Sequence, residues 1–218
     1  PDGPGPESVD FVPLASVPAG EQILFNDWSF PDRVLSMRPD GSDATPILSL
    51  YRVWSMGVSR AGDRLAIAIG DPLQEENYGI TIGDSIQHTW IYDMASQDLY
   101  PVAVGNINDE CHHFGPSDER LYVCRRYDFT SEGGFSGYRI GRLALGSLDF
   151  EWLLPDDDSF TLIPQVRDGD MIFTRIVLAG GSQTGTLERL PFDGTPELLL
   201  ADATRAVLSP DGGRVVYS

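Results

Sequence analysis

The chain has 218 residues, of which 33 are Asp or Glu and 15 are Lys or Arg, so its net charge is −18 at pH 7; all the basic residues are arginines. A surface this acidic repels phosphate backbones and anionic membranes, so we expect no nucleic-acid partner. No apolar run approaches the about 20 residues of a transmembrane helix, so we expect the chain not to span a membrane.

The chain starts with a segment typical of a linker. Residues 1–8 are PDGPGPES, which is rich in Pro and Gly and lacks the apolar stretch of a signal peptide. We interpret the chain as the mature form of an exported protein, periplasmic or extracellular, whose signal has been removed. Residues 9–218 are expected to form a single domain.

One unit, a tight turn followed by an apolar strand, recurs five times. Its copies are VPAGEQILF at 17–25, SRAGDRLAI at 59–67, GPSDERLYV at 115–123, VRDGDMIF at 166–173 and SPDGGRVVYS at 209–218. Pro, Asp, Ser and Gly favour turns, and the β-branched residues behind them favour strands. The equivalent turn residues Gly20, Gly62, Asp118, Gly169 and Gly212 are 42, 56, 51 and 43 residues apart. Periods of this size are typical of propellers.

Short strands fill each repeat, because Gly and Pro interrupt every window long enough for an amphipathic helix. The expected strands are 11–16, 21–27, 33–41 and 45–50; 53–59, 64–70, 89–95 and 99–104; 110–114, 120–127, 138–145 and 150–154; 161–166, 170–177, 185–194 and 196–201; 204–209 and 214–218. The repeats then span about 9–50, 52–104, 109–154, 160–201 and 203–218. Four strands in a meander make one blade. The sequence thus predicts an all-β fold, a β-propeller of four complete four-stranded antiparallel blades plus the first half of a fifth.

The unit SPDGGRVVYS, together with strands such as RVLSMRPDGSDATPIL at 33–48, resembles the repeat of TolB-type (WD40-like) β-propellers. The family consensus has a Ser-Pro-Asp-Gly turn followed by a strand. The resemblance covers nearly the whole chain, and only the last copy is close to the consensus. It implies a periplasmic interaction module whose ring has more blades, so we expect the ring to continue past Ser218. The alternative is a compact five-blade ring with one two-stranded blade.

Long loops between the second and third strands of the blades, at 71–88, 128–137 and 178–184, are where we expect a protein or peptide to bind. The candidate binding residues are Glu75, Glu76, Tyr78, His88, Trp90, Arg125, Arg126, Tyr127, Phe129 and Phe135. The alternative is that the aromatic residues only hold the loops against the blades.

The two cysteines flank a predicted turn. If Phe114 pairs with Leu121, an antiparallel register places Cys111 opposite Cys124, close enough for a disulfide in an exported protein. The neighbouring His112 and His113 suggest zinc as an alternative, but the spacing matches no standard zinc motif. We therefore expect no metal and no cofactor.

Catalytic motifs are absent from the sequence. There are three histidines, no Gly-x-Ser-x-Gly elbow and no phosphate-binding loop. We expect a non-catalytic scaffold. Two alternatives stay open: the propeller domain of a hydrolase, a peptidase or a polysaccharide-active enzyme, whose catalytic part lies outside this chain, and a structural subunit of a larger cell-surface assembly.

Overall fold

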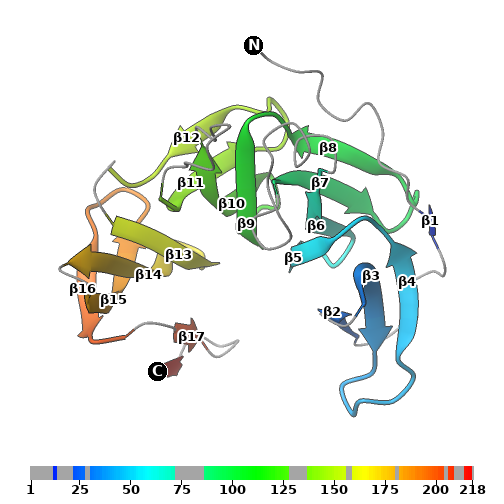
Figure 1. The fold of residues 1–218 in the computed structure, drawn as a ribbon, viewed down its shortest axis with the longest axis horizontal. Coiled ribbons are helices and arrows are strands. Elements are labelled where there is room, and N and C mark those ends of the chain that lie inside the picture. The colour runs from blue at the N-terminus through cyan, green and yellow to red at the C-terminus, as the bar shows by residue number, and fades with distance from the viewer. Residues whose placement is uncertain are drawn as a thin grey trace.

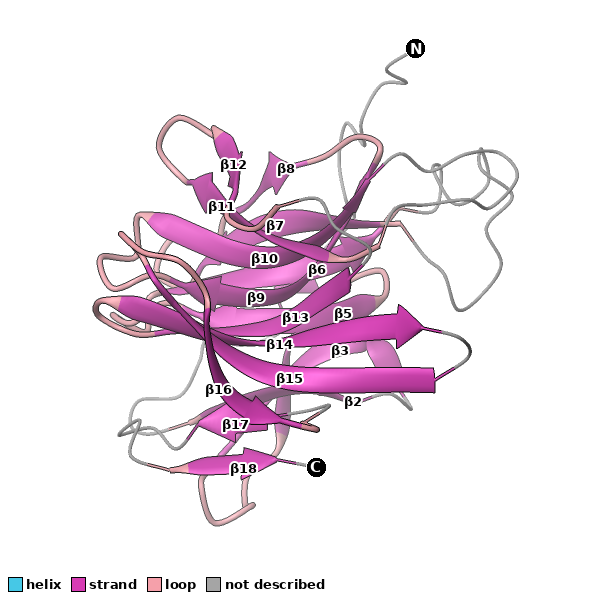
Figure 2. Cartoon of the chain, turned by 90° about the vertical axis from the view of Figure 1, so that its left-hand side faces the viewer, coloured by secondary structure: helices cyan, strands magenta, loops and turns pink. Residues whose placement is uncertain are grey.

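In a computed structural model of the protein, the structure describes residues 12–13, 22–27, 30–71, 86–127, 137–155, 159–179, 182–203, 206–208 and 214–217. All regular structure in these ranges is β-strand, and no helix occurs in them. The strands form antiparallel sheets that fan out around a common centre (Figure 1). Seen from the side, strands of successive sheets run roughly alongside one another, with turns at both ends (Figure 2). The all-β prediction is confirmed.

Four of the sheets have four strands and the fifth has two. The first sheet contains β1 (Val12–Pro13), β2 (Ile23–Asp27), β3 (Phe30–Met37) and β4 (Thr45–Ser49), and the second contains β5 (Val53–Val58), β6 (Arg64–Gly70), β7 (Gln87–Asp93) and β8 (Leu99–Ala103). The third sheet contains β9 (Ile107–Phe114), β10 (Arg120–Tyr127), β11 (Arg139–Ala144) and β12 (Phe150–Trp152), and the fourth contains β13 (Ser159–Val166), β14 (Asp170–Ala179), β15 (Ser182–Pro191) and β16 (Glu197–Ala201). The fifth contains β17 (Ala206–Leu208) and β18 (Val215–Tyr217). The inner strands β2, β5, β9 and β13 lie nearest the centre, and β8, β12 and β16 lie at the rim (Figure 1).

The strand order of the first sheet differs from the predicted meander. The order is β1-β4-β3-β2, so the segment expected as the first strand of the meander lies outside β4, with Val12 opposite Ser49. Pro13 has no N–H to donate, which restricts this segment to a sheet edge. The inner position belongs to β2, where the side-chain amide of Asn26 donates to the carbonyl of Val53 in the second sheet at 2.9 Å.

Apolar residues on both faces of β6 place this strand between two layers of core. Leu65 and Ile67 pack in one cluster with Leu48 of the first sheet. Ala66 packs in another with Phe114 of the third sheet. A strand buried on both faces is expected to be apolar throughout, which explains the run RLAIAIG at 64–70.

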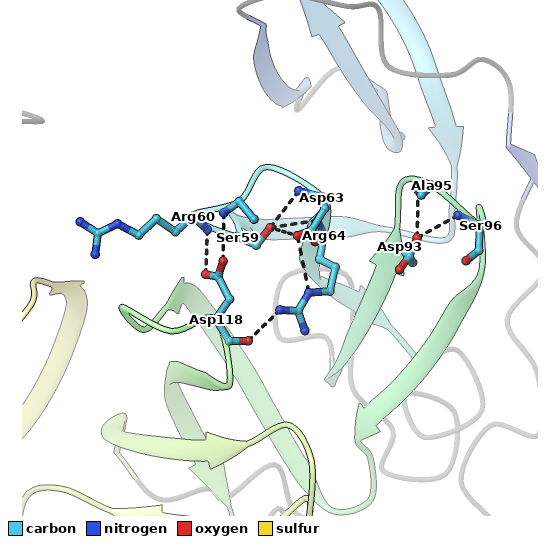
Figure 3. A network of polar contacts seen from close by, with 9 residues as sticks. Ser59, Arg60, Asp63, Arg64, Asp93, Ala95, Ser96 and Asp118 are labelled. Carbon is cyan, nitrogen blue, oxygen red and sulfur yellow. Dashed lines mark hydrogen bonds and ion pairs between the residues drawn. The ribbon is translucent and has the colours of Figure 1, made fainter.

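The tight turns fasten neighbouring sheets to each other through Asp118 (Figure 3). This residue stands where the other repeats have glycine, and it has the same left-handed backbone, with φ of 57° against 73° at Gly62. Its carboxylate accepts hydrogen bonds from the backbone N–H groups of Arg60 at 2.7 Å and Ala61 at 2.9 Å. The turn of the third sheet therefore caps the turn of the second.

Replacing Asp118 with alanine should loosen this junction. We expect Asp118→Ala to lower the free energy of unfolding by about 2 kcal/mol more than Asp43→Ala does, because charge-assisted hydrogen bonds contribute about 1.5–3 kcal/mol. Asp43 has the same φ of 57° but lies in an exposed turn, so its variant carries the same backbone cost without the contacts between sheets. Urea unfolding measures both, and equal losses would show that the Asp118 carboxylate adds nothing.

Candidate functional site

The second and third sheets meet around a group of polar side chains, which we call the inner polar cluster: the half-buried Ser55 and the buried Thr89, Asp109, His112 and Arg125. At its centre, Arg125 donates from Nε and Nη2 to the two carboxylate oxygens of Asp109, at 2.6 and 2.7 Å. Asp109 is fully buried, and the guanidinium of Arg125 also stacks on the ring of Phe150, 3.6 Å from its centroid. Two parallel charge-assisted bonds fix this pair in one orientation.

The hydrogen bonds around His112 define its protonation. Thr89 Oγ1 donates to Asp109 Oδ2 at 2.8 Å, so it accepts from His112 Nε2 at 2.9 Å. His112 Nδ1 then accepts from Ser55 Oγ at 3.0 Å, and Ser55 Oγ in turn accepts from the backbone N–H of Cys111 at 3.1 Å. Burial lowers the pKa of His112 to about 4, so the imidazole is neutral near pH 7. Its single proton is then on Nε2, the nitrogen that donates to Thr89.

Ser55 and His112 are the residue types of a nucleophile and its general base. However, a base needs a pKa near the working pH, and burial holds that of His112 far below neutrality. Both ring nitrogens are also occupied by bonds within the cluster. Because Ser55 and Thr89 belong to the second sheet and Asp109 and His112 to the third, this arrangement is best suited to joining the two sheets.

A second group of polar side chains, which we call the loop-base cluster, consists of Asp71, His88, Asn108, Glu110 and Tyr138. The first two stand at the ends of the segment 72–85, which joins β6 to β7. The carboxylate of Asp71 lies 3.3 Å from His88 Nδ1, and both side chains are buried. The backbone N–H of Asp71 donates to the carbonyl of Ile86 at 2.9 Å. The two ends of this loop are therefore held together.

Asn108 connects these loop ends with those of the segment 128–136. Its Oδ1 accepts from the backbone N–H of Gln87 at 2.9 Å, beside the first loop. Its Nδ2 donates to the hydroxyl of Tyr138 at 3.2 Å, beside the second, and to Glu110 at 3.2 Å. The Tyr138 hydroxyl itself donates to the Glu110 carboxylate, and burial raises the pKa of Tyr138. One side chain thus joins the bases of both loops.

The predicted binding residues are buried, half-buried, or in or beside the loops. His88, Trp90 and Arg125 are buried, Trp90 within the apolar cluster between the first and second sheets. Arg126 is half-buried, and its guanidinium lies 3.8 Å from the centroid of the Tyr138 ring.

The remaining predicted residues stand in or beside the loops. Tyr127 ends β10, where its backbone pairs with Ile107. Glu75, Glu76, Tyr78, Phe129 and Phe135 lie outside the described residues. Of the predicted set, the structure therefore brings His88 and Arg126 to the bases of the loops.

Sequence reasoning missed Asp71, Asn108 and Asp109. The signal was the polar triplet Asn108-Asp109-Glu110 directly before the Cys-His-His-Phe of the predicted strand. The predicted strand began at residue 110, whereas β9 begins at Ile107, so two of the three were assigned to a loop. Polar residues inside the inner strand of a sheet require partners, which in this protein are Gln87, Thr89 and Arg125.

The predicted strand register, which placed Cys111 opposite Cys124, is wrong at Cys111. Phe114 pairs with Leu121 as predicted, but a bulge follows, and Glu110 instead of Cys111 stands opposite Cys124. Cys111 takes the left-handed backbone of the bulge, with φ of 55°, and its N–H is bonded to Ser55 of the second sheet. Both cysteines lie in described ranges and are thiols in the structure, which therefore does not confirm the predicted disulfide.

The zinc alternative also concerns this region. Within the part of the chain that the structure describes, no three His, Cys, Asp or Glu side chains are grouped so that they could hold a metal ion. His112 is instead bonded to Ser55 and Thr89, and His113 Nδ1 lies 2.9 Å from the carbonyl of Phe114.

Acid should destabilise the protein through its histidines. Burial lowers the pKa of all three, His88, His112 and His113, so below pH 6.5 the unfolded chain takes up protons that the folded chain does not. Stability should be constant above pH 6.5 and fall as the pH approaches 4, by roughly 2 kcal/mol for His112 at pH 4.5. Urea unfolding at pH 7.5 and 4.5 measures this, and His112→Gln should lose part of the slope. An unchanged slope would mean that His112 is protonated in the folded state.

Comparison with solved structures identifies the class of fold. The chain is similar to the tricorn protease (TM-score 0.61, 11% identity, covering 86% of this chain and 22% of that one) and to TolB from Acinetobacter baumannii (0.61, 13%, 90% and 46%). It is also similar to the β-propeller domain of the Trilobed protease from Pyrococcus furiosus (0.55, 10%, 89% and 57%). The chain has a TolB-like β-propeller fold, and it spans between about a fifth and somewhat over half of these chains.

The sequence itself gives no match. No protein-family model and no curated protein matches the chain. Among the described residues, no helix is long and apolar enough to cross a membrane.

Proposed function

We propose that the chain is a non-catalytic, exported β-propeller that binds a protein or peptide through the loops at 72–85 and 128–136. The observation that supports this proposal is the double contact of Asn108, which joins the bases of both loops. Loops anchored on a rigid frame are where binding usually develops, because preorganisation reduces the entropy lost on binding. Buried contacts at Asp71 and Tyr138 hold the residues that flank these loops.

The nature of the partner follows from the loop composition. Glu75, Glu76 and Tyr78 in the first loop and Phe129 and Phe135 in the second combine charge with aromatic surface, the composition of a protein-binding surface. The resemblance to TolB-type propellers supports a periplasmic or extracellular location for the interaction. Arg125 has no part in this surface, because it is buried against Asp109.

The test is the capture of a partner from an extract of the source organism, followed by titration of the purified partner. We expect Glu75→Ala combined with Tyr78→Ala to weaken binding at least tenfold without lowering the melting temperature. Tyr100→Ala is the matched control, since Tyr100 is an exposed aromatic residue on the rim strand β8. Equal affinity of both variants for the partner would contradict binding by the first loop.

A second candidate is the propeller domain of a hydrolase. The specific observation is that the similar structures include the tricorn protease and the propeller of the Trilobed protease, of which this chain spans a part. On this hypothesis the full natural protein cleaves fluorogenic peptide substrates, and the propeller alone does not. Absence of hydrolysis by the full protein would contradict it.

A further inference from the structure

The outer edges of the four-stranded sheets differ in how they are protected against pairing with another strand. The edge of β4 is covered by β1. In β8, Pro101 stands in the strand and has no N–H to donate. β12 has three residues, and its Glu151 is paired with Arg142. Covering, proline, shortness and charge are the usual means by which proteins block edge-to-edge pairing.

β16 has no proline and, within the described residues, no strand that covers its outer side; it ends the order β13-β14-β15-β16. Its only protection of the usual kinds is a charged residue at its start, Glu197, and a bulge. It lies at the rim of the molecule (Figure 1). Two adjacent residues, Leu198 and Leu199, are 64% and 46% exposed, which is unusual for leucine in a strand.

The backbone of β16 explains why both leucines face outward. The register shifts between the pairs Leu187–Leu200 and Glu188–Leu198, so Leu199 is the extra residue of a bulge. Leu200 packs inward against Ile172 and Leu187. Leu200 therefore anchors β16 to its sheet, while Leu198 and Leu199 are exposed to solvent beside the outer edge of the strand.

Exposed carboxylates flank this edge: Asp193 before it, Glu197 at its start and Asp202 after it. Among the described residues, Arg189 is paired with two carboxylates, Asp170 at 2.7 Å and Glu197 at 3.5 Å. We propose that β16 accepts an extended peptide segment of another protein, with apolar side chains against Leu198 and Leu199 and basic residues beside the carboxylates. The segment adds as a fifth strand to the fourth sheet, a known mode of peptide recognition.

Charge decides between a basic segment and a second copy of this chain. Each copy has a net charge of −18, and pairing two β16 edges brings the same carboxylates towards each other. Like charges disfavour such a dimer, whereas a basic segment gains from every flanking carboxylate. This site is separate from the loops at 72–85 and 128–136, and its existence does not depend on what they bind.

The probe for this site is a fluorescein-labelled peptide of about nine alternating valine and arginine residues, titrated by fluorescence anisotropy. We expect saturable binding that is at least tenfold weaker for the double variant Leu198→Lys, Leu199→Lys. The double variant Tyr100→Lys, Val104→Lys adds the same charge at two residues that are 42% and 43% exposed near β8, and it should bind like the wild type.

A second arm tests main-chain pairing without changing the protein. A peptide N-methylated at alternate residues cannot donate hydrogen bonds along one edge, and we expect it to bind at least tenfold more weakly than the parent. Absence of saturable binding, equal weakening by both double variants, or equal binding of the methylated peptide would overturn the proposal. So would self-association of the wild type in sedimentation that the Leu198→Lys, Leu199→Lys variant abolishes, because the occupant would then be a second copy.

Discussion

Replacing Asp109 with asparagine should destabilise the protein by about 3–5 kcal/mol, the usual cost of removing one partner of a buried ion pair. The change keeps the volume of the side chain but leaves Arg125, which is 7% exposed, as a buried cation without its counter-charge. It also disturbs the acceptor of Thr89 and, through Thr89, the proton on His112 Nε2. Urea unfolding measures the loss, and the melting temperature should fall by roughly 10 °C.

The ion pair between Arg60 and Asp168 provides a matched control. It joins the same residue types, but the two side chains are 62% and 78% exposed, so solvent screens the pair and Asp168→Asn should destabilise the protein much less than Asp109→Asn. Combining Asp109→Asn with Arg125→Met should destabilise less than the sum of the two single changes, because the double variant leaves no unpaired charge. If Asp109→Asn and Asp168→Asn cost the same, the inner polar cluster does not hold the sheets together.

Much of the fold could be predicted from the sequence because each strand carries its own local signal. The turn residues and the period of the repeats set the strands of the second to fourth sheets close to where they lie. The first sheet was harder, because β1 has only two residues, one of them a proline, and its place next to β4 depends on contacts with residues far along the chain. Non-local pairing of this kind leaves no local pattern.

The candidate site was less predictable for a similar reason. His88 and Arg125 were selected as candidate binding residues, but sequence does not show whether such residues meet a partner inside the protein. Their partners, Asp71 and Asp109, lie 17 and 16 residues away along the chain. The bulge at Cys111 was also invisible, since a single extra residue shifts the pairing beyond it and can be located only once the neighbouring strand is in place.

Replacing Gly57 with alanine should separate the second sheet from the third. A Cβ on Gly57 would lie 2.5 Å from the backbone oxygen of His112 and 2.9 Å from its carbonyl carbon, so β5 and β9 approach each other only because this residue has no side chain. These are backbone atoms of a strand that is paired with β10, so they cannot move without disturbing that pairing. We expect a loss of about 3 kcal/mol in the free energy of unfolding, at the upper end for overpacking.

The control is Gly146→Ala, since a Cβ on Gly146 meets no atom within 4 Å, and we expect no loss of stability there. NMR of the imidazole separates a specific effect from general damage. Pushing β5 away from β9 should break the bond between Ser55 Oγ and His112 Nδ1 and admit solvent, so the pKa of His112 should rise from about 4 towards 6.5. A destabilised variant in which the pKa of His112 stays low would mean that the sheets remain together and that the strain is absorbed elsewhere.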